Sequence, residues 1–118
     1  MDYFRKATKT SPAVMMDSKT RSALISGSSL CRDTTVYASV IKEMIEQFEK
    51  FDYSDLNIKL DVFNTIAAKS LFDLLRSFKF KSKAPSIHWH FDKKDLEMNE
   101  MANDYSELLE MEFEISDN

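Results

Sequence analysis

Hydrophobic and polar positions form their clearest pattern between residues 56 and 79. At the start of this stretch apolar residues alternate with polar and charged ones, which is typical of a half-buried strand. The spacing of apolar residues then changes to three and four, which predicts a helix over about residues 66–79. Asn64 and Thr65 are both residue types that favour the cap position of a helix. The sequence therefore predicts a strand that leads directly into a helix, with Thr65 at their junction.

Shorter patterns predict the other elements. They are a hairpin of strands at 13–16 and 22–26, a helix from about 34 to 51, a strand at 86–91, a helix from about 95 to 109 and an optional strand at 111–115. Asp33 is a candidate cap of the first helix, and Gly27, the single glycine, is predicted to lie where φ is positive or another backbone passes close by.

The expected fold class is α/β, in one domain. Strands that alternate with helices long enough for crossovers favour a mixed four- to five-stranded sheet with three helices on one side or both, in the order β-β-α-β-α-β-α(-β). Residues 1–8 are predicted to form a flexible N-terminal segment, and residues 9–118 the folded domain.

Composition narrows the classes of function. A chain of 118 residues with 43% hydrophobic content suits a single core, and one cysteine indicates a reducing compartment, so we expect a cytoplasmic protein. No apolar run approaches the ~20 residues of a membrane span. Residues 92–118 hold 2 Lys against 10 Asp and Glu, and this acidic end disfavours nucleic acid as a partner.

Thr65 is the candidate site for chemistry. At the start of a helix the first backbone N–H groups lack intrahelical partners and the dipole is positive, so a phosphoryl group added there can be held. Lys69 lies one turn further on the same face and could pair with that charge. The alternative is that Thr65 only caps the helix, which is the usual role of threonine at such a place.

Features of an enzyme or a metal site are weak in this sequence. His88, His90 and Asp92 share one face of a predicted strand, but there is no further histidine and only one cysteine to complete a metal site. We therefore interpret both histidines as exposed strand residues and predict no metal and no cofactor. The chain also has no Gly-rich phosphate loop and no nucleophile signature, which favours a binding module over an enzyme.

Several segments together resemble the SiaC family of bacterial regulatory phosphoproteins, over roughly Thr8 to Ile115. The segments are Thr8-Lys9-Thr10-Ser11-Pro12 with Val14, Ile25-Ser26-Gly27-Ser28, Phe63-Asn64-Thr65 with Ala68-Lys69, Trp89-His90-Phe91-Asp92, and the late pattern Asp95, Met98, Asp104-Tyr105, Leu108-Leu109 and Phe113-Glu114. Their order and spacing carry the resemblance, since no one segment is decisive.

The resemblance implies a STAS-like domain of the anti-sigma-factor-antagonist type. A serine/threonine kinase would phosphorylate such a domain and a metal-dependent phosphatase would reverse the modification. The unmodified form would bind a downstream effector, in known cases a diguanylate cyclase that controls biofilm formation. The family's phosphoacceptor falls on Thr65, and Asn64 and Lys69 are the residues we expect to contact the phosphate or the partner.

Two departures from the family pattern keep an alternative open. The family continues its Asn-Thr motif with small hydroxyl residues, whereas this chain has Ile66 and Ala67. It also lacks the family's Pro-Glu-Asn turn, in place of which stands Leu30-Cys31-Arg32-Asp33. The alternative is a constitutive protein-interaction module that phosphorylation does not regulate.

Overall fold

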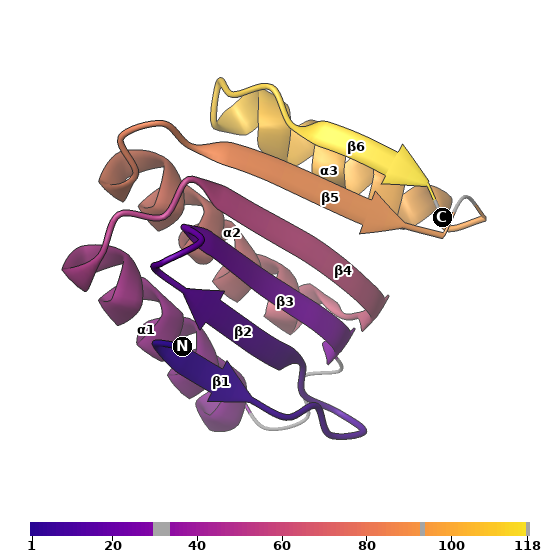
Figure 1. Ribbon diagram of the computed structural model, residues 1–118. Helices are drawn as coiled ribbons and strands as arrows, with labels where there is room; N and C mark the ends of the chain where they lie inside the picture. Colours follow the sequence, from indigo (N-terminus) through magenta and orange to yellow (C-terminus); the bar gives the residue numbers. More distant parts are fainter. Residues whose placement is uncertain (30–33, 93, 118) are drawn as a thin grey trace.

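The computed structural model (Figure 1) describes residues 1–29, 34–92 and 94–117. Within these ranges its description does not extend to the side chains of Ser29, Thr34, Val62, Phe63, Thr65, Ile66 and Asp117. The predicted cap residue Asp33, and the Leu30-Cys31-Arg32-Asp33 segment as a whole, lie outside the described residues.

Six strands of the described chain form one sheet in the order β1-β2-β3-β4-β5-β6. The strands are β1 (Tyr3–Arg5), β2 (Ala13–Asp17), β3 (Ser22–Ser29), β4 (Asp55–Phe63), β5 (Ser86–Phe91) and β6 (Glu114–Asp117). The helices are α1 (Thr34–Lys50), α2 (Thr65–Lys81) and α3 (Leu96–Leu108). β1, β2 and β3 pair in antiparallel fashion, and β3 to β6 pair in parallel.

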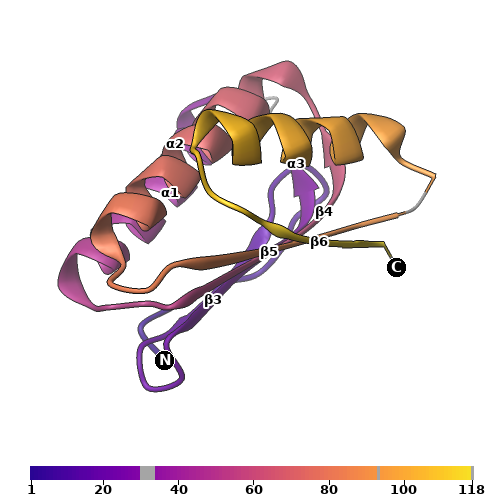
Figure 2. The same ribbon diagram turned by 90° about the horizontal axis from the view of Figure 1, so that it is seen from above.

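All three helices lie on the same face of the sheet (Figure 2). Each helix connects a strand to its parallel neighbour, and each of these connections steps one strand further in the same direction. Because such crossovers are right-handed, repeated steps in one direction place every helix on one side. Of the two arrangements that the sequence allowed, the structure has the one-sided cover.

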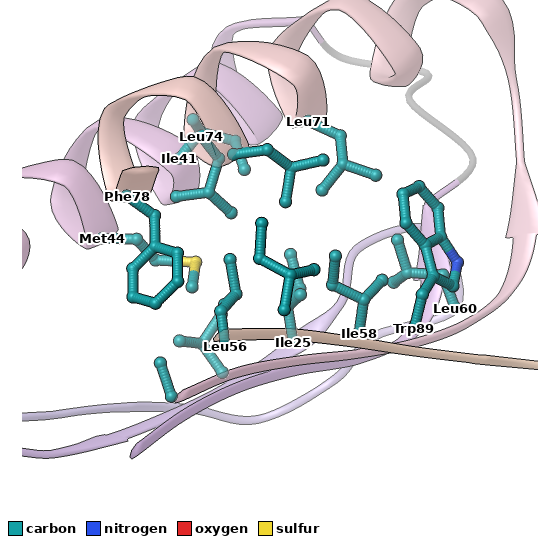
Figure 3. Packing of buried hydrophobic residues seen from close by; sticks show 14 of the residues in the cluster. Ile25, Ile41, Met44, Leu56, Ile58, Leu60, Leu71, Leu74, Phe78 and Trp89 are labelled. Carbon is teal, nitrogen blue, oxygen red and sulfur yellow. The ribbon is translucent and has the colours of Figure 1, made fainter. Parts of the chain in front are cut away.

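The hydrophobic core fills the space between the sheet and the helices (Figure 3). β4 shows the origin of this core, because Leu56, Ile58 and Leu60 are buried while Lys59 and Asp61 are exposed. From the helices, Met44, Leu71, Leu74 and Phe78 meet the sheet, and Trp89 closes the cluster from β5. The predicted alternation in the central strand is therefore confirmed at these described positions.

Gly27 adopts a φ of 97° within β3. The register of β3 against β4 shifts between Gly27 and Ser28, as at a β-bulge. L-residues rarely adopt such a φ, so glycine is required at this bulge. The prediction of a positive φ at this position is confirmed.

Several sequence predictions can be compared with the observed elements. The α/β class, the three helices and the element order are confirmed, and the sheet has one strand more than the four or five expected. The extra strand, β1, lies inside the segment 1–8 and was not predicted. The optional strand expected at 111–115 is present as β6, at Glu114–Asp117.

Candidate functional site

The junction between β4 and α2 lies at the carboxyl end of a central strand (Figure 1). Asn64 has an extended conformation, with φ −125° and ψ 169°, and its side-chain Oδ1 accepts a hydrogen bond from the backbone N–H of Ala67 at 3.1 Å. Its carbonyl accepts the first helical bond, from the N–H of Ala68 at 3.1 Å. These are the features of an N-cap, so the cap of α2 is Asn64.

Thr65 is the first residue of α2. A helix leaves the N–H groups of its first turn without intrahelical partners, and the Asn64 side chain accepts a hydrogen bond from one of them, the N–H of Ala67. No acidic residue lies in this first turn, so the turn itself has no carboxylate to offset the positive end of the helix dipole. A negatively charged group at position 65 would therefore find hydrogen-bond donors in the backbone N–H groups and a favourable electrostatic field from the helix dipole. The side chain of Thr65 is not among those that the structure describes.

Lys69 lies one turn beyond Thr65 and is exposed. Residues four apart on a helix lie on the same face, separated by about 6 Å along the axis. The Lys69 side chain, which is long and flexible, therefore extends from the same face of α2 as position 65. Asn64, Thr65 and Lys69 thus belong to the cap and the first two turns of α2.

Contacts from α3 also stabilise the start of α2. The hydroxyl of Tyr105 donates a hydrogen bond to the carbonyl of Ala68 at 2.8 Å, and the Tyr105 ring packs edge-on against Phe72 with ring centroids 5.0 Å apart. Burial, and to a lesser degree the nearby Asp104, raises the pKa of Tyr105, so the hydroxyl stays protonated and remains a donor. This contact joins residues 37 positions apart in the sequence, so no local pattern indicates the positioning role of Tyr105.

His88 and His90 lie on the sheet face that carries no helix, but they bond to different partners. His88 contacts Glu114 through Nδ1 at 2.7 Å and Asp55 through Nε2 at 3.2 Å. His90 Nδ1 lies 2.9 Å from the Ser116 hydroxyl. Burial, followed by the positive charge of Lys59, lowers the pKa of His90.

These contacts assign both histidines to interstrand bonding. Among the residues that the structure describes, no group of three or more His, Cys, Asp or Glu side chains has the arrangement of a metal site. Both histidines are strand residues, as predicted, but the prediction that they are exposed is wrong. They are half-buried because their rings contact residues of β4 and β6.

The fold and the helix start at Thr65 define a single-domain α/β protein with a hydroxyl residue where an anion is favoured. A model of the SiaC family, described as SiaC family regulatory phosphoprotein, matches residues 5–118. The chain belongs to this family. Comparison with curated protein sequences finds no match.

Solved structures share the fold over the whole chain. One chain of the crystal structure of the diguanylate cyclase SiaD in complex with its activator SiaC from Pseudomonas aeruginosa aligns with a TM-score of 0.81 at 20% identity, covering 99% of this chain and 100% of that one. Apo-SiaC from the same organism aligns with a TM-score of 0.78 at 21% identity and 98% coverage of both chains. At this identity the likeness establishes the fold.

In the part of the chain that the structure describes, none of the helices combines the length and the apolar character that crossing a bilayer requires.

Proposed function

We propose that this chain is a non-enzymatic phospho-switch of a bacterial partner-switching pathway, with Thr65 as the phosphoacceptor. The observation that carries the proposal is that Asn64 caps α2 while Thr65 is its first residue. The structural role that competed with phosphorylation, capping of the helix, is thus filled by the neighbouring residue. Membership of a family of regulatory phosphoproteins supports the same role.

The proposed partners are a serine/threonine kinase, a metal-dependent serine/threonine phosphatase and a downstream effector. The effector we favour is a diguanylate cyclase, so that the pathway would control biofilm formation from the cytoplasm. Support comes from the similar structure in which SiaC is the activator of the diguanylate cyclase SiaD. In this scheme the unphosphorylated chain binds and regulates the effector, and phosphorylation of Thr65 releases it.

The electrostatics of α2 make such a switch physically reasonable. A phosphoryl group adds about −1.5 to −2 charges at pH 7, which the helix start and Lys69 can accept within the free protein. In a complex the same group would have to be desolvated or would meet an acidic partner surface. A cost of ~3 kcal/mol to the interface would weaken binding more than a hundredfold. No refolding of the domain is needed.

A binding role fits the topology better than catalysis. In open α/β sheets the ligand crevice forms where the strand order reverses. In the described part of the chain the order runs from β1 to β6 without such a reversal. This supports a protein that acts through its surface.

The experiment that tests the proposal is phosphorylation followed by mass measurement. The chain is incubated with ATP and the serine/threonine kinase encoded nearest to it, and its intact mass and phosphopeptides are determined. We expect one added phosphoryl group, located on Thr65, and none in Thr65→Ala. Ser70→Ala, five residues further along α2, is the matched control and should still be modified. An unmodified wild-type chain would favour the constitutive interaction module.

Binding of the effector then reports the state of the switch. We expect Thr65→Ala to bind the neighbouring diguanylate cyclase as wild type does, and Thr65→Glu to fail, since it places a permanent negative charge at the helix start. Equal binding by both variants would contradict release by phosphorylation.

A further inference from the structure

The face of the sheet opposite the helices carries no described secondary structure element (Figure 2). Parallel strands usually have both faces covered, and β3 to β6 are parallel. This sheet, with helices on one face, therefore has less cover than parallel sheets normally have. What the uncovered face presents decides whether another chain could cover it.

Part of this face, on β1 to β3, is apolar. The strand register places Phe4 beside Met15 and Met15 beside Leu24, so these three side chains form a row across β1, β2 and β3. Phe4 is 55% exposed and Met15 41% exposed, and Met1 beside them is 65% exposed. We call Met1, Phe4, Met15 and Leu24 the apolar patch. With large side chains of about 200 Å² each, it exposes on the order of 300 Å², the lower end of the range for the largest apolar patch on a typical monomer, and such patches are often functional.

The apolar patch borders a hollow in the sheet face. This depression of about 370 Å³ is lined by Met1, Met15 and Leu24 from the patch, and by Ser22, Ala23 and Asn57 from the neighbouring strands. A projecting Phe4 and a hollow thus occur side by side on one surface. An isologous interface needs both on each copy, because each copy presents the same surface to the other.

The charges around the hollow have the same self-complementary arrangement. In the strand register Asp17 lies beside Ser22, two residues before Leu24. Lys59 lies beside Ser26, two residues after Leu24, so an anion and a cation flank Leu24 on opposite sides. Both line the depression. A two-fold axis through Leu24, in the plane of the interface, can bring Asp17 of each copy over Lys59 of the other.

We propose that a second copy of this chain covers the bare sheet face, in a two-fold dimer centred on Leu24. Six strands about 4.8 Å apart and five residues long span roughly 24 Å by 17 Å, or about 400 Å² before side-chain relief is added. Stable interfaces bury about 800 Å² on each partner. The flat outline of the face is about half of that area, which is the size of a weak interface, so the dimer is expected to dissociate in the micromolar range. The proposal does not depend on phosphorylation of Thr65.

Sedimentation velocity between about 1 and 300 μM tests the proposal on the full chain. The wild-type mass is expected to rise from 13.7 kDa towards twice that value with concentration. Asp17→Lys and Lys59→Glu each place like charges opposite each other, so each should weaken the dimer at least tenfold. An equimolar mixture of the two variants restores a Lys–Glu and a Lys–Asp pair, and dimers should reappear.

Controls separate this interface from others. Asp17 also accepts a hydrogen bond from the backbone N–H of Lys19 at 3.0 Å, so circular dichroism must confirm that Asp17→Lys is folded. Met15→Glu tests the apolar patch without touching that turn and should also give monomers. Leu108→Ser, at a 69% exposed position on α3, should leave the dimer intact. A wild-type monomer at every concentration, a mixture that stays monomeric, or a dimer broken only by Leu108→Ser would overturn the proposal.

Discussion

Replacing Asn64 by alanine tests whether Asn64, and not Thr65, caps α2. The change removes the oxygen that accepts the 3.1 Å hydrogen bond from the N–H of Ala67 and leaves that N–H at the helix start without its side-chain partner. Loss of a capping side chain costs about 1 kcal/mol. With a urea m value of about 2 kcal/mol per molar, the unfolding midpoint should fall by about 0.5 M.

Urea unfolding followed by circular dichroism compares wild type with three variants. Asn64→Asp keeps an oxygen acceptor beside the positive helix end and should stay within about 0.5 kcal/mol of wild type. Thr65→Val removes only a hydroxyl that does not supply the cap and should also cost less than about 0.5 kcal/mol. A wild-type midpoint for Asn64→Ala, together with a large loss for Thr65→Val, would refute the assignment and return the capping role to Thr65.

Three further changes test other parts of the structure. Leu74→Ala leaves a cavity at a fully buried position between the sheet and the helices and should lower the free energy of unfolding by about 3 kcal/mol. A loss below about 1 kcal/mol would contradict the place of Leu74 in the core. Tyr105→Phe removes the 2.8 Å hydrogen bond to the carbonyl of Ala68, which should lower the free energy of unfolding by about 1 kcal/mol and speed amide exchange at the start of α2. Unchanged exchange would show that this bond does not stabilise the start of the helix. The pKa of Asp2 lies below its ordinary value, chiefly because the Tyr53 hydroxyl donates to it, so its carboxylate stabilises the fold above the ordinary carboxyl pKa and this contribution is lost as the pH falls. Asp2→Asn should therefore be less stable than wild type at about pH 6 and approach it at about pH 3, and an equal difference at both would contradict the direction of the shift.

The junction at Thr65 was predictable because its signals are local. Alternation in β4, the change of period after it and a capping residue between the two all lie within one short stretch of sequence. What local signals left open was which of two adjacent capping types serves as the cap. The bond from Ala67 to Asn64 in the folded chain decides that question.

The two edges of the sheet were harder to predict because distant contacts form them. β1 has only three residues, too few for a periodic pattern, and it is fixed by pairing with β2 and by a hydrogen bond from the Tyr3 hydroxyl to Glu43 on α1. β6 begins later than its apolar residues suggest. The chain first turns through Glu110, which has a φ of 53°, and the N–H of Met111 still bonds to Ser106 of α3 at 3.0 Å.

Side-chain partners across the sheet were likewise beyond local patterns. The sequence correctly placed His88 and His90 on one face, but their different bonding depends on which strands become neighbours. Lys79 gives a second example. Its place near the end of α2 suits the helix dipole, and in the fold its ammonium also donates to the carbonyl of Leu109.

The affinity of the effector for the two phosphorylation states tests the central claim most directly. The chain is prepared unmodified and kinase-treated, with the modification mapped to Thr65, and each form is titrated by calorimetry into the diguanylate cyclase encoded nearest to it. We predict binding of the unmodified form and a loss of more than a hundredfold on phosphorylation, the equivalent of about 3 kcal/mol. Equal affinity of both forms would contradict the claim that Thr65 controls this interaction.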